Sequence, residues 1–425
     1  MTKISHHDPI LILQKMFSKA LEVADPKICV PPVLPPPPLG KTIFLGAGKA
    51  AASMARAVEQ NWDGQLSGIA VTREGYGVPC KRIEVIEASH PIPDVRSHRA
   101  SKKILELAHT LRPTDLCIAA ISGGASSLLS APIPGLKFGD KQEINRLLLK
   151  SGASISEINT VRKHLSRIKG GRLAEAIFPA HLSTILISDV PGDDPATIGS
   201  GPTVPDNTTS ADALAVLKKF NINQPSMVYK KLANSESETP KEGSKFFENT
   251  KVVTACIPMH GLESAANFAH SVGLKAHIIS DRLQGDSKIV AKSHAKLALN
   301  TMIGNGPVTP PCVLLSGGET TVAIKGNGRG GPNTEYALAL AIELKGNKNV
   351  YGIACDTDGI DGSENNAGAI ITPEFWSRAQ RLGLTPNNYL ENNDSFSFFE
   401  KIDSLIFTGP TFTNINDFRA LLVLP

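Results

Sequence analysis

Glycine and lysine at the end of the first apolar run have the chemistry of an anion site. The segment Gly46-Ala47-Gly48-Lys49 follows that run and precedes a helical pattern. Glycines there let the backbone come close to an anion, and the start of a helix adds N–H donors with partial positive charge. The ammonium group of Lys49 is then placed to bind a phosphate or a carboxylate. With Ala51 in the third place, the segment also matches the looser GxGxxG/A pattern of dinucleotide-binding turns, and a plain glycine turn with a solvated lysine is the third interpretation.

Carboxylates follow two other apolar runs. Residues 189–194 hold three acids, which could bind Mg²⁺ or accept a hydroxyl proton, although acids in a turn are commonly just turn formers. Asp189 is the strongest candidate because it lies nearest the carboxyl end of its run, where ligands of open α/β sheets gather. The acids of segment 356–362, Asp358 among them, lack the spacing of an EF-hand. They point to Mg²⁺ or to substrate hydroxyls.

Two segments combine glycine with hydroxyl side chains at the end of an apolar run. They are Ser122-Gly123-Gly124, followed by Ala125-Ser126-Ser127, and Ser316-Gly317-Gly318, followed by Glu319-Thr320-Thr321. Paired glycines beside hydroxyls make a nest of N–H donors for oxyanions, but the first segment is explained as well by an ordinary turn.

Basic residues occur in two different contexts. Arg329 stands in a glycine loop before Pro332, which suits the first turn of a helix, so the loop aims an arginine and helix N–H groups at one place. An arginine there can clamp a phosphate or a carboxylate through two hydrogen bonds. By contrast, segment 162–172 gathers six basic or histidine side chains, and for most of these we prefer a solvated helix face.

The elements that must position these residues alternate along the chain. A proline-rich connector spans residues 31–38. Expected strands lie at 42–45, 68–72, 83–88, 116–121 and 182–188, and expected helices at 8–23, 50–60, 96–111, 141–151, 156–166 and 211–220. After a polar stretch at 234–244, strands follow at 252–257, 276–279, 313–316, 350–355 and 405–408, with helices at 262–272, 288–302, 333–345, 373–382 and 395–402. The pattern predicts two α/β domains, at 1–235 and 250–425, the first with a largely parallel sheet.

Composition limits the class of protein. A chain of 425 residues with 41% hydrophobic and 20% charged residues is typical of a soluble protein with two domains. The net charge of +4 and the 5% of aromatic residues do not favour a nucleic-acid partner. We expect no membrane partner and a cytoplasmic location, because no apolar stretch reaches the length of about 18 residues that spans a bilayer and the start lacks a signal-peptide pattern. The six cysteines form no CxxC pair, which favours a reducing compartment.

The order of the motifs resembles that of the MOFRL glycerate kinases, also called class II glycerate 2-kinases. The matching segments cover nearly the whole chain: GAGKAA (46–51), ASHPIPD (88–94), ISGGASSLL (121–129), INTVRKHLSRIKGGRLA (158–174), SDVPGDDP (188–195), GSGPTVPD (199–206), LSGGETTV (315–322), GRGGPNTE (328–335), TDGIDG (357–362) and TNIND (413–417). The resemblance implies a Rossmann-like N-terminal domain, a smaller C-terminal α/β domain and an active site in the cleft. It also implies transfer of the γ-phosphoryl group of ATP to a glycerate hydroxyl, usually at C2, with Mg²⁺.

The resemblance assigns roles to individual residues. Lys49 and Arg329 match the basic active-site positions of the family, and Asp189, Glu319, Asp358 and Asn414 match its polar positions. This chain departs from the family pattern at Ala125, Pro332, Thr334, Phe412 and the loop 363–366, which bears on fine substrate specificity more than on the class of reaction.

We therefore predict phosphorylation of D-glycerate to 2-phosphoglycerate, with ATP and Mg²⁺. The expected site comprises catalytic Lys49, Asp189 and Arg329, the metal ligands Glu319 and Asp358, and residues that bind nucleotide or substrate (Gly46, Gly48, Ser122, Gly123, Gly124, Ser316, Gly317, Gly318 and Asn414). The expected partners are the small molecules glycerate and ATP, and the sequence permits a homodimer. The alternative is an NAD(P)H-dependent hydroxypyruvate reductase, which the glycine pattern permits, and a third interpretation is a metabolite-binding protein without catalysis.

Overall fold

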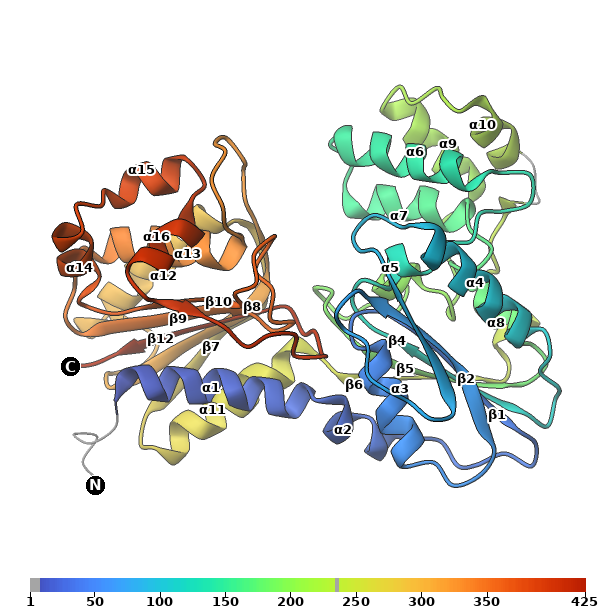
Figure 1. The fold of residues 1–425 in the computed structure, drawn as a ribbon, viewed down its shortest axis with the longest axis horizontal. Coiled ribbons are helices and arrows are strands. Elements are labelled where there is room, and N and C mark those ends of the chain that lie inside the picture. Colours follow the sequence, from blue (N-terminus) through green and yellow to red (C-terminus); the bar gives the residue numbers. More distant parts are fainter. Residues whose placement is uncertain (1–7, 234–236) are drawn as a thin grey trace. The chain divides into compact units, whose positions relative to one another are not determined.

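The computed structural model describes residues 8–233 and 237–425 (Figure 1). Residues 1–7 of the predicted first domain and residues 234–236 of the predicted polar stretch lie outside the described residues. The chain divides into two compact units. We call them the N-terminal unit (26–188 and 193–255) and the C-terminal unit (8–25, 189–192 and 256–425). Each unit contains a six-stranded sheet with helices, so the predicted pair of α/β domains is confirmed.

The sheet of the N-terminal unit has the order β3-β2-β1-β4-β5-β6, the order found in dinucleotide-binding Rossmann sheets. Its strands are β1 (Thr42–Ala47), β2 (Leu66–Arg73), β3 (Ile83–Ala88), β4 (Leu116–Ile121), β5 (His181–Ile187) and β6 (Thr250–Cys256). The first five pair in parallel. Every residue of β1 and β4 is buried, as expected of central strands covered on both faces. The predicted Rossmann-like architecture is therefore present.

The helices of this unit include a group that stands apart from its sheet, formed by α6, α7, α9 and α10 (Figure 1). That group has its own apolar core, which includes Ile144, Val161, Leu217 and Leu232. The helices of the unit are α2 (Pro26–Cys29), α3 (Ala51–Gln60), α4 (Val95–Ala108), α5 (Ala125–Leu128), α6 (Phe138–Lys150), α7 (Ile155–His164), α8 (Arg172–Ile177), α9 (Ser210–Lys219) and α10 (Ser226–Leu232), with 3-10 turns at Pro31–Val33, Ile198–Ser200 and Lys245–Phe247.

The sheet of the C-terminal unit is mixed and has the order β11-β10-β9-β12-β8-β7. Its strands are β7 (Lys275–Asp286), β8 (Cys312–Thr321), β9 (Val350–Asp356), β10 (Gly368–Ile371), β11 (Leu405–Ile406) and β12 (Asp417–Val423). Strand β12 is antiparallel to both β8 and β9, whereas β7 and β8 are parallel. The carboxyl ends of β8 and β9 therefore lie beside the start of β12.

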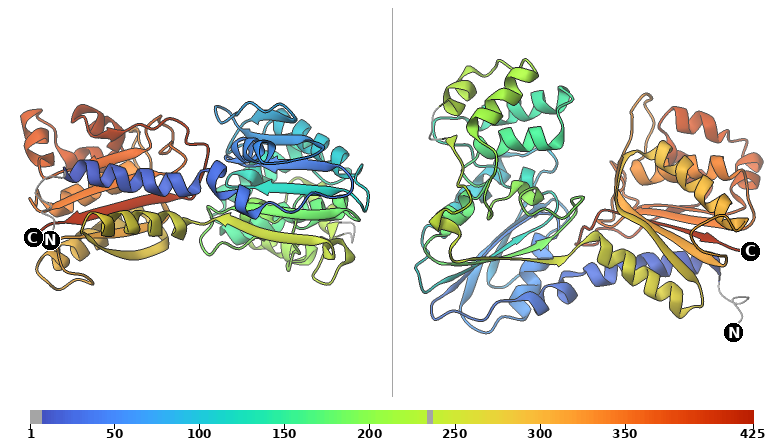
Figure 2. Two further views of the ribbon diagram at one scale, coloured as in Figure 1. Left: turned by 90° about the horizontal axis from the view of Figure 1, so that it is seen from below. Right: turned by 180° about the vertical axis from the view of Figure 1, so that it is seen from behind.

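Helices cover both faces of this second sheet (Figures 1 and 2). Helices α1 (Pro9–Ala24) and α11 (Pro258–Ser271) pack on one face, in a core that includes Phe17 and Leu262. The opposite core includes Tyr336 and Phe398 and is formed with α12 (Ser287–Met302), α13 (Pro332–Leu344), α14 (Phe375–Arg381) and α16 (Ser395–Lys401), next to α15 (Pro386–Glu391). None of the described helices is long and apolar enough to cross a membrane.

The structure does not divide the chain at the single predicted cut between 235 and 250. Helix α1 was expected in the N-terminal domain, but its apolar side packs against α11 in the C-terminal unit. Strand β6 was expected in the C-terminal domain, but it forms the edge of the first sheet. Apolar periodicity identifies an amphipathic helix or a strand, but it does not identify the partner that covers it.

One central strand of the second sheet was not predicted from the sequence. The last expected strand was 405–408, whereas β12 lies between β8 and β9 and all seven of its residues are buried. Asp417 and Arg419 interrupt the apolar run there. Their mutual ion pair explains how both can lie in a central strand.

Candidate functional site

The two glycine loops of the N-terminal unit are hydrogen-bonded to each other. They follow the neighbouring parallel strands β1 and β4, so both leave the same edge of the sheet. The N–H of Lys49 donates to the carbonyl oxygen of Gly123 (2.8 Å), and the N–H of Ala50 donates to Oγ of Ser122 (3.1 Å). Gly48 has φ +128°, and a Cβ added to it would lie 2.2 Å from Oγ of Ser122. Only glycine allows this close approach, so the predicted loops are brought together as expected.

The same contacts use up the backbone donors at the start of α3. The N–H of Gly48 donates to the carbonyl of Val71, and the N–H of Ala51 donates to that of Gly48 (both 3.1 Å). Gly46 lies within β1, in register with strands on both sides. The prediction that Gly46 and Gly48 offer N–H groups to a ligand therefore does not fit this structure. The turn instead positions Lys49, whose carbonyl accepts from Oγ1 of Thr72 (3.2 Å).

Gly123 and Gly124 keep the features of an oxyanion nest. Within the described residues, the N–H groups of these two glycines make no hydrogen bond. Gly124 adopts φ +80° directly before α5, and a Cβ there would lie 3.0 Å from Nε2 of His90. Successive N–H groups around a left-handed residue form a concave donor set for anions. These glycines therefore suit a phosphate or carboxylate oxygen.

Asp189 and Asn414 form a direct contact between two predicted site residues. Nδ2 of Asn414 donates to Oδ2 of Asp189 (2.8 Å), and both residues belong to the C-terminal unit. Oδ1 of Asn414 accepts from the N–H of Asn416 (3.2 Å), which fixes the amide. Asp194, by contrast, accepts from the N–H of Ala196 and acts as a turn former. Asp189 therefore stays the predicted functional acid of that loop.

Asp417 joins several predicted motifs in the C-terminal unit. At the start of β12 it lies opposite Gly318 of β8 and Asp356 of β9. Its carboxylate accepts from Nδ2 of Asn333 (2.6 Å) and from the N–H of Thr320 (3.3 Å). The motifs at 315–322, 328–335 and 413–417 therefore converge on one buried carboxylate, and Asp356, which lies opposite it, directly precedes the motif at 357–362. The sequence alone did not single out Asp417 or Asn333, although each lies within a motif segment.

Ser316, Gly317 and Gly318 were expected to form a ligand-binding loop, but they lie within strand β8. Their backbones are in register with residues 417–419 of β12. Gly318 has φ +103°, and a Cβ there would lie 2.2 Å from the backbone nitrogen of Leu283. These glycines therefore permit close pairing with β7. Glu319, the next residue, is exposed on the strand.

The start of α13 is capped by a carboxylate of the same unit. Oδ1 and Oδ2 of Asp361 accept from the N–H groups of Asn333 (2.9 Å) and Thr334 (2.8 Å). Burial raises the pKa of Asp361 to about 6 even though it accepts these hydrogen bonds. Pro332 occupies the first turn of the helix, as predicted. The expectation that N–H groups of this helix face a ligand beside Arg329 does not fit, because Asp361 occupies them.

The Arg329 side chain is oriented by neighbours on both sides. Its guanidinium lies over the ring of Phe396, 4.4 Å from the centroid, and Nη2 donates to Oε2 of Glu364 (2.8 Å). Its backbone N–H donates to Oδ1 of Asp394 (2.9 Å). The side chain is 51% exposed, so it remains accessible to an anion that replaces Glu364.

The expected metal ligands differ in environment. Asp358 is buried, and its Oδ1 accepts from the N–H of Ile360 (2.8 Å), whereas Glu319 is exposed. The described residues contain no cluster of three histidine, cysteine, aspartate or glutamate side chains suited to a metal ion. A cation held by one or two carboxylates and the phosphates of a nucleotide does not need such a cluster.

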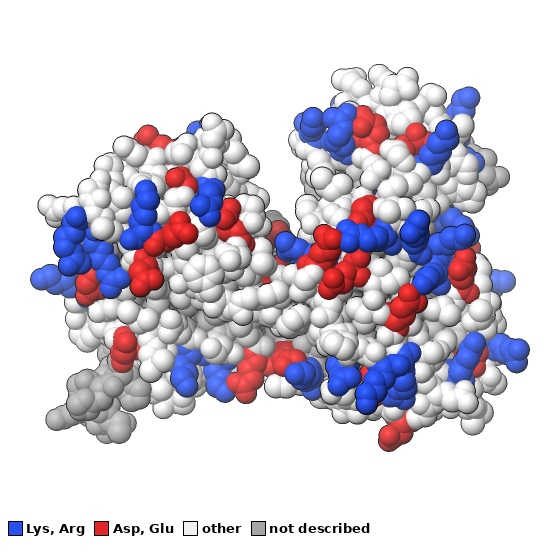
Figure 3. Space-filling model, viewed as in Figure 1, with Lys and Arg blue, Asp and Glu red and all other residues white. Residues whose placement is uncertain are grey.

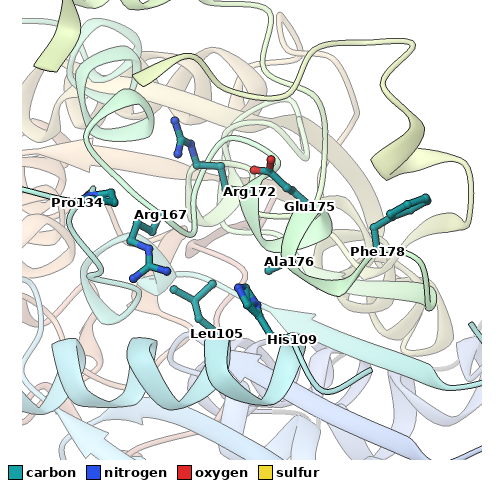
Figure 4. Close-up of a pocket in the computed structure, with 8 residues that line it drawn as sticks. All are labelled: Leu105, His109, Pro134, Arg167, Arg172, Glu175, Ala176 and Phe178. Atoms are coloured by element: carbon teal, nitrogen blue, oxygen red, sulfur yellow. The ribbon is translucent and has the colours of Figure 1, made fainter. Parts of the chain in front are cut away.

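The basic segment 162–172 is not the solvated face that the sequence suggested. Lys163, His164 and Lys169 are buried, and Nζ of Lys163 pairs with Oδ1 of Asp206 (3.2 Å). Arg167 and Arg172 line a cavity of about 630 Å³ with Leu105, His109 and Glu175 (Figure 4). The glycine loops do not contribute to this cavity.

On the described residues of the face shown in Figure 3, basic and acidic side chains are interspersed on each unit, without a basic stripe.

Comparisons with known proteins cover both units. The model of the MOFRL family matches residues 312–417, and that of a domain of unknown function, DUF4147, matches residues 12–233. A protein of Agrobacterium vitis named "Putative hydroxypyruvate reductase" is 48% identical, over 97% of this chain and 94% of its own. The D-glycerate 2-kinase of Thermotoga maritima is 38% identical, over 95% of each chain. A crystal structure of glycerate kinase from that organism superposes with a TM-score of 0.88 and 36% identity, covering 97% of this chain and 99% of its own.

Proposed function

The chain belongs to the MOFRL family of glycerate kinases, and from this premise we propose that it transfers the γ-phosphoryl group of ATP to D-glycerate, as a glycerate 2-kinase. The observation that carries the proposal is similarity to a D-glycerate 2-kinase over 95% of both chains, a span that reaches into both units. ATP is then a substrate, and the second substrate is a small hydroxy acid.

The reductase alternative rests on the glycine turn and on the name of a relative. Two observations weigh against it. The N–H groups of residues 48–51, which would face a dinucleotide pyrophosphate, are already hydrogen-bonded. Glu74, the acid that could meet a ribose after β2, is paired with Nη1 of Arg96 (2.5 Å). Both observations favour the kinase.

The roles of the residues follow from the charge of the reaction. Phosphoryl transfer spreads negative charge over the transferred group and depends on positioning and electrostatic stabilisation. Lys49 and Arg329 supply positive charge to phosphate or carboxylate oxygens. The N–H groups of Gly123 and Gly124 bind an oxyanion, and Ser122 holds their loop against the start of α3 by accepting from the N–H of Ala50. Asp189, oriented by Asn414, accepts or orients the hydroxyl proton of glycerate.

Mg²⁺ would be held by Glu319 and Asp358 together with phosphate oxygens of ATP. The donors fit this cation because both are carboxylates, which Mg²⁺ prefers, and one or two protein carboxylates suffice when phosphates complete the set. When bound, such an ion would supply positive charge that offsets the charge of the phosphates. Two further parts of the proposal are a cytoplasmic location and a homodimer, and light scattering of the purified protein tests the second.

The reaction is tested directly with purified protein. D-Glycerate, ATP and Mg²⁺ are expected to yield ADP and 2-phosphoglycerate, identified by ³¹P and ¹³C NMR. In parallel, hydroxypyruvate and NADH are expected to leave the absorbance of NADH unchanged. Oxidation of NADH without formation of ADP would overturn the kinase and support the reductase. Binding of glycerate without either reaction would support a protein that binds metabolites without catalysis.

Glu364 is expected to compete with the anionic ligand of Arg329. It sits in the loop 363–366, where this chain departs from the family, and it accepts a hydrogen bond from the guanidinium. Glu364→Gln removes the competing charge, so the KM of the ligand bound by Arg329 should fall by up to about fivefold, the range of an exposed ion pair. Steady-state kinetics with ATP and glycerate varied in turn identify that ligand.

The matched control is Glu74→Gln, which removes the carboxylate of the exposed pair with Arg96 in the other unit. It should leave both KM values unchanged. A rise in KM for Glu364→Gln would mean that Glu364 positions Arg329 and does not compete with its ligand.

A further inference from the structure

Three cationic side chains of the N-terminal unit act on one another electrostatically, and none of them forms an ion pair with an acid of the described residues. Lys141 of α6 and Lys169, which follows α7, are 3% and 1% exposed, and Arg162 of α7 is half-buried. They act on one another: Arg162 lowers the pKa of Lys141, and both lower the pKa of Lys169, in each case in addition to the larger effect of burial. We call these residues the cation cluster.

The polar atoms of the cation cluster are unequally satisfied. Nζ of Lys169 donates to the carbonyl oxygens of Ser126 (2.7 Å) and Leu129 (2.8 Å). Nε of Arg162 donates to Oδ1 of Asn145 (2.9 Å). Nζ of Lys141 is buried and has no hydrogen-bond partner among the described residues. An ammonium group in that position would leave all three of its N–H donors without an acceptor among the described residues.

The surroundings of the cation cluster connect it to the proposed substrate loop. Ser126 and Leu129 lie in and just after α5, whose N-cap residue is Gly124, so Lys169 is anchored to the segment that carries the oxyanion nest. Arg162 also lines a cavity of about 370 Å³ together with Asn145, residues 91–93 and the ion-paired Glu143 and Arg146. The cluster is therefore connected to the glycine loop through Lys169, and Arg162 is its member that reaches this cavity.

Burying several like charges without a counter-charge is strongly unfavourable, and buried charges are paired, hydrogen-bonded or neutral. A lysine in such a place can also be kept neutral by its surroundings. Met or Leu would fill the same volume without this cost. A function for the charge therefore explains its presence better than packing does.

We propose that Lys141, Arg162 and Lys169 form an oxyanion subsite that receives a carboxylate or phosphate group of a substrate or product of the proposed kinase. Lys141 supplies the unused N–H donors. Lys169 connects the subsite to the 122–127 loop through its hydrogen bonds, and Arg162 lies on the side of the subsite that faces the cavity. The inference rests on the proposed function for the identity of the ligand, but the binding of an oxyanion does not require turnover.

The test uses the full-length protein and three probes without Mg²⁺: inorganic phosphate, D-glycerate and ATP. Isothermal titration calorimetry should show binding of at least one probe, and Lys141→Met should weaken that binding by about 10- to 100-fold. In buffer without these probes, Lys141→Met should raise Tm by about 2–10 °C, because folding then no longer has to deprotonate and bury an amine that is charged in the unfolded chain. The probe that binds distinguishes the carboxylate of glycerate from phosphate.

Proton uptake gives a readout that a purely structural lysine would not produce. Burial lowers the pKa of Lys141 to about 7, so at pH 8 most of the ligand-free protein has a neutral amine. A bound anion raises that pKa again, and up to about one proton should be taken up per anion at pH 8. Titrations in buffers of different ionisation enthalpy measure this uptake, which Lys141→Met should abolish.

Lys150→Met is the matched control, since Lys150 is exposed in the last turn of the same helix and should change neither binding nor proton uptake. If Lys141→Met does not fold, Lys141→Gln provides the same measurements. Wild-type affinity for every probe in the Lys141 variant, or no binding by the wild-type protein, would overturn the subsite. Binding that depends on Lys141 in a protein without kinase activity would keep the subsite and reject the proposed reaction.

Discussion

Lys49→Ala is expected to lower kcat for phosphorylation of glycerate by about 10²- to 10³-fold, the usual effect of removing one electrostatic group that stabilises a transition state. The turn between β1 and α3 holds this lysine firmly, because every backbone N–H from residue 48 to 51 is hydrogen-bonded. None of these bonds involves the Lys49 side chain, so the substitution should leave the loop in place. Steady-state kinetics with ATP and glycerate, together with circular dichroism and Tm, check both parts.

Lys41→Ala is the control for this substitution. Lys41 is a partly exposed lysine just before β1, and its Nζ contacts Oγ1 of Thr110 (3.3 Å), away from the glycine loops. The variant should retain the kcat of the wild-type protein. If Lys49→Ala also retained wild-type kcat and KM, Lys49 would be a solvated turn residue and the proposed role of the loop would fail.

The Rossmann-like sheet could be predicted because its central strands are buried on both faces. Such strands appear in a sequence as unbroken apolar runs bounded by glycine, as β1 and β4 do. The end of each run located Lys49 and Ser122. Their proximity followed from the rule that parallel strands present their carboxyl ends at one edge of a sheet.

Which backbone N–H groups donate to the protein itself, and which are left for a ligand, could not be predicted from the same pattern. Gly48 and Gly124 are both glycines with positive φ at a strand end. The N–H of Gly48 donates to a carbonyl of β2, whereas that of Gly124 makes no hydrogen bond within the described residues. Partners of this kind are backbone atoms of other strands, and the identity of a side chain carries no information about them.

The burial of charged side chains was the feature that could be predicted least well from the sequence. Lys163 is paired with Asp206, 43 residues further along the chain, and Lys169 is satisfied by two backbone carbonyls. A cluster of basic residues in a helical segment indicates a solvated face unless such distant partners are known. Asp361 is a similar case, because it caps α13, an element that precedes it in the chain.

Asp417→Ala should lower the free energy of unfolding of the C-terminal unit by about 3–5 kcal/mol, because it leaves a buried arginine without its counter-charge. Arg419 is 1% exposed, and Nε and Nη1 of its guanidinium already have no hydrogen-bond partner among the described residues. Its Nη2 donates to Asp417 and to Oγ1 of Thr320 (2.9 Å). Native-state hydrogen exchange of β8, β9 and β12 measures the loss for this unit alone.

Two variants separate the loss of the ion pair from other effects of this substitution. Glu22→Ala breaks the exposed pair with Lys19 on α1 in the same unit and should cost no more than about 1 kcal/mol. The double variant Asp417→Ala/Arg419→Met should recover part of the loss, since it removes the uncompensated charge as well. A double variant less stable than Asp417→Ala would show that Arg419 contributes through its guanidinium, which lies 5.0 Å from the centroid of the Tyr336 ring, and through its bond to Thr320. In that case the ion pair would not be the reason that an acid and an arginine can lie in the central strand.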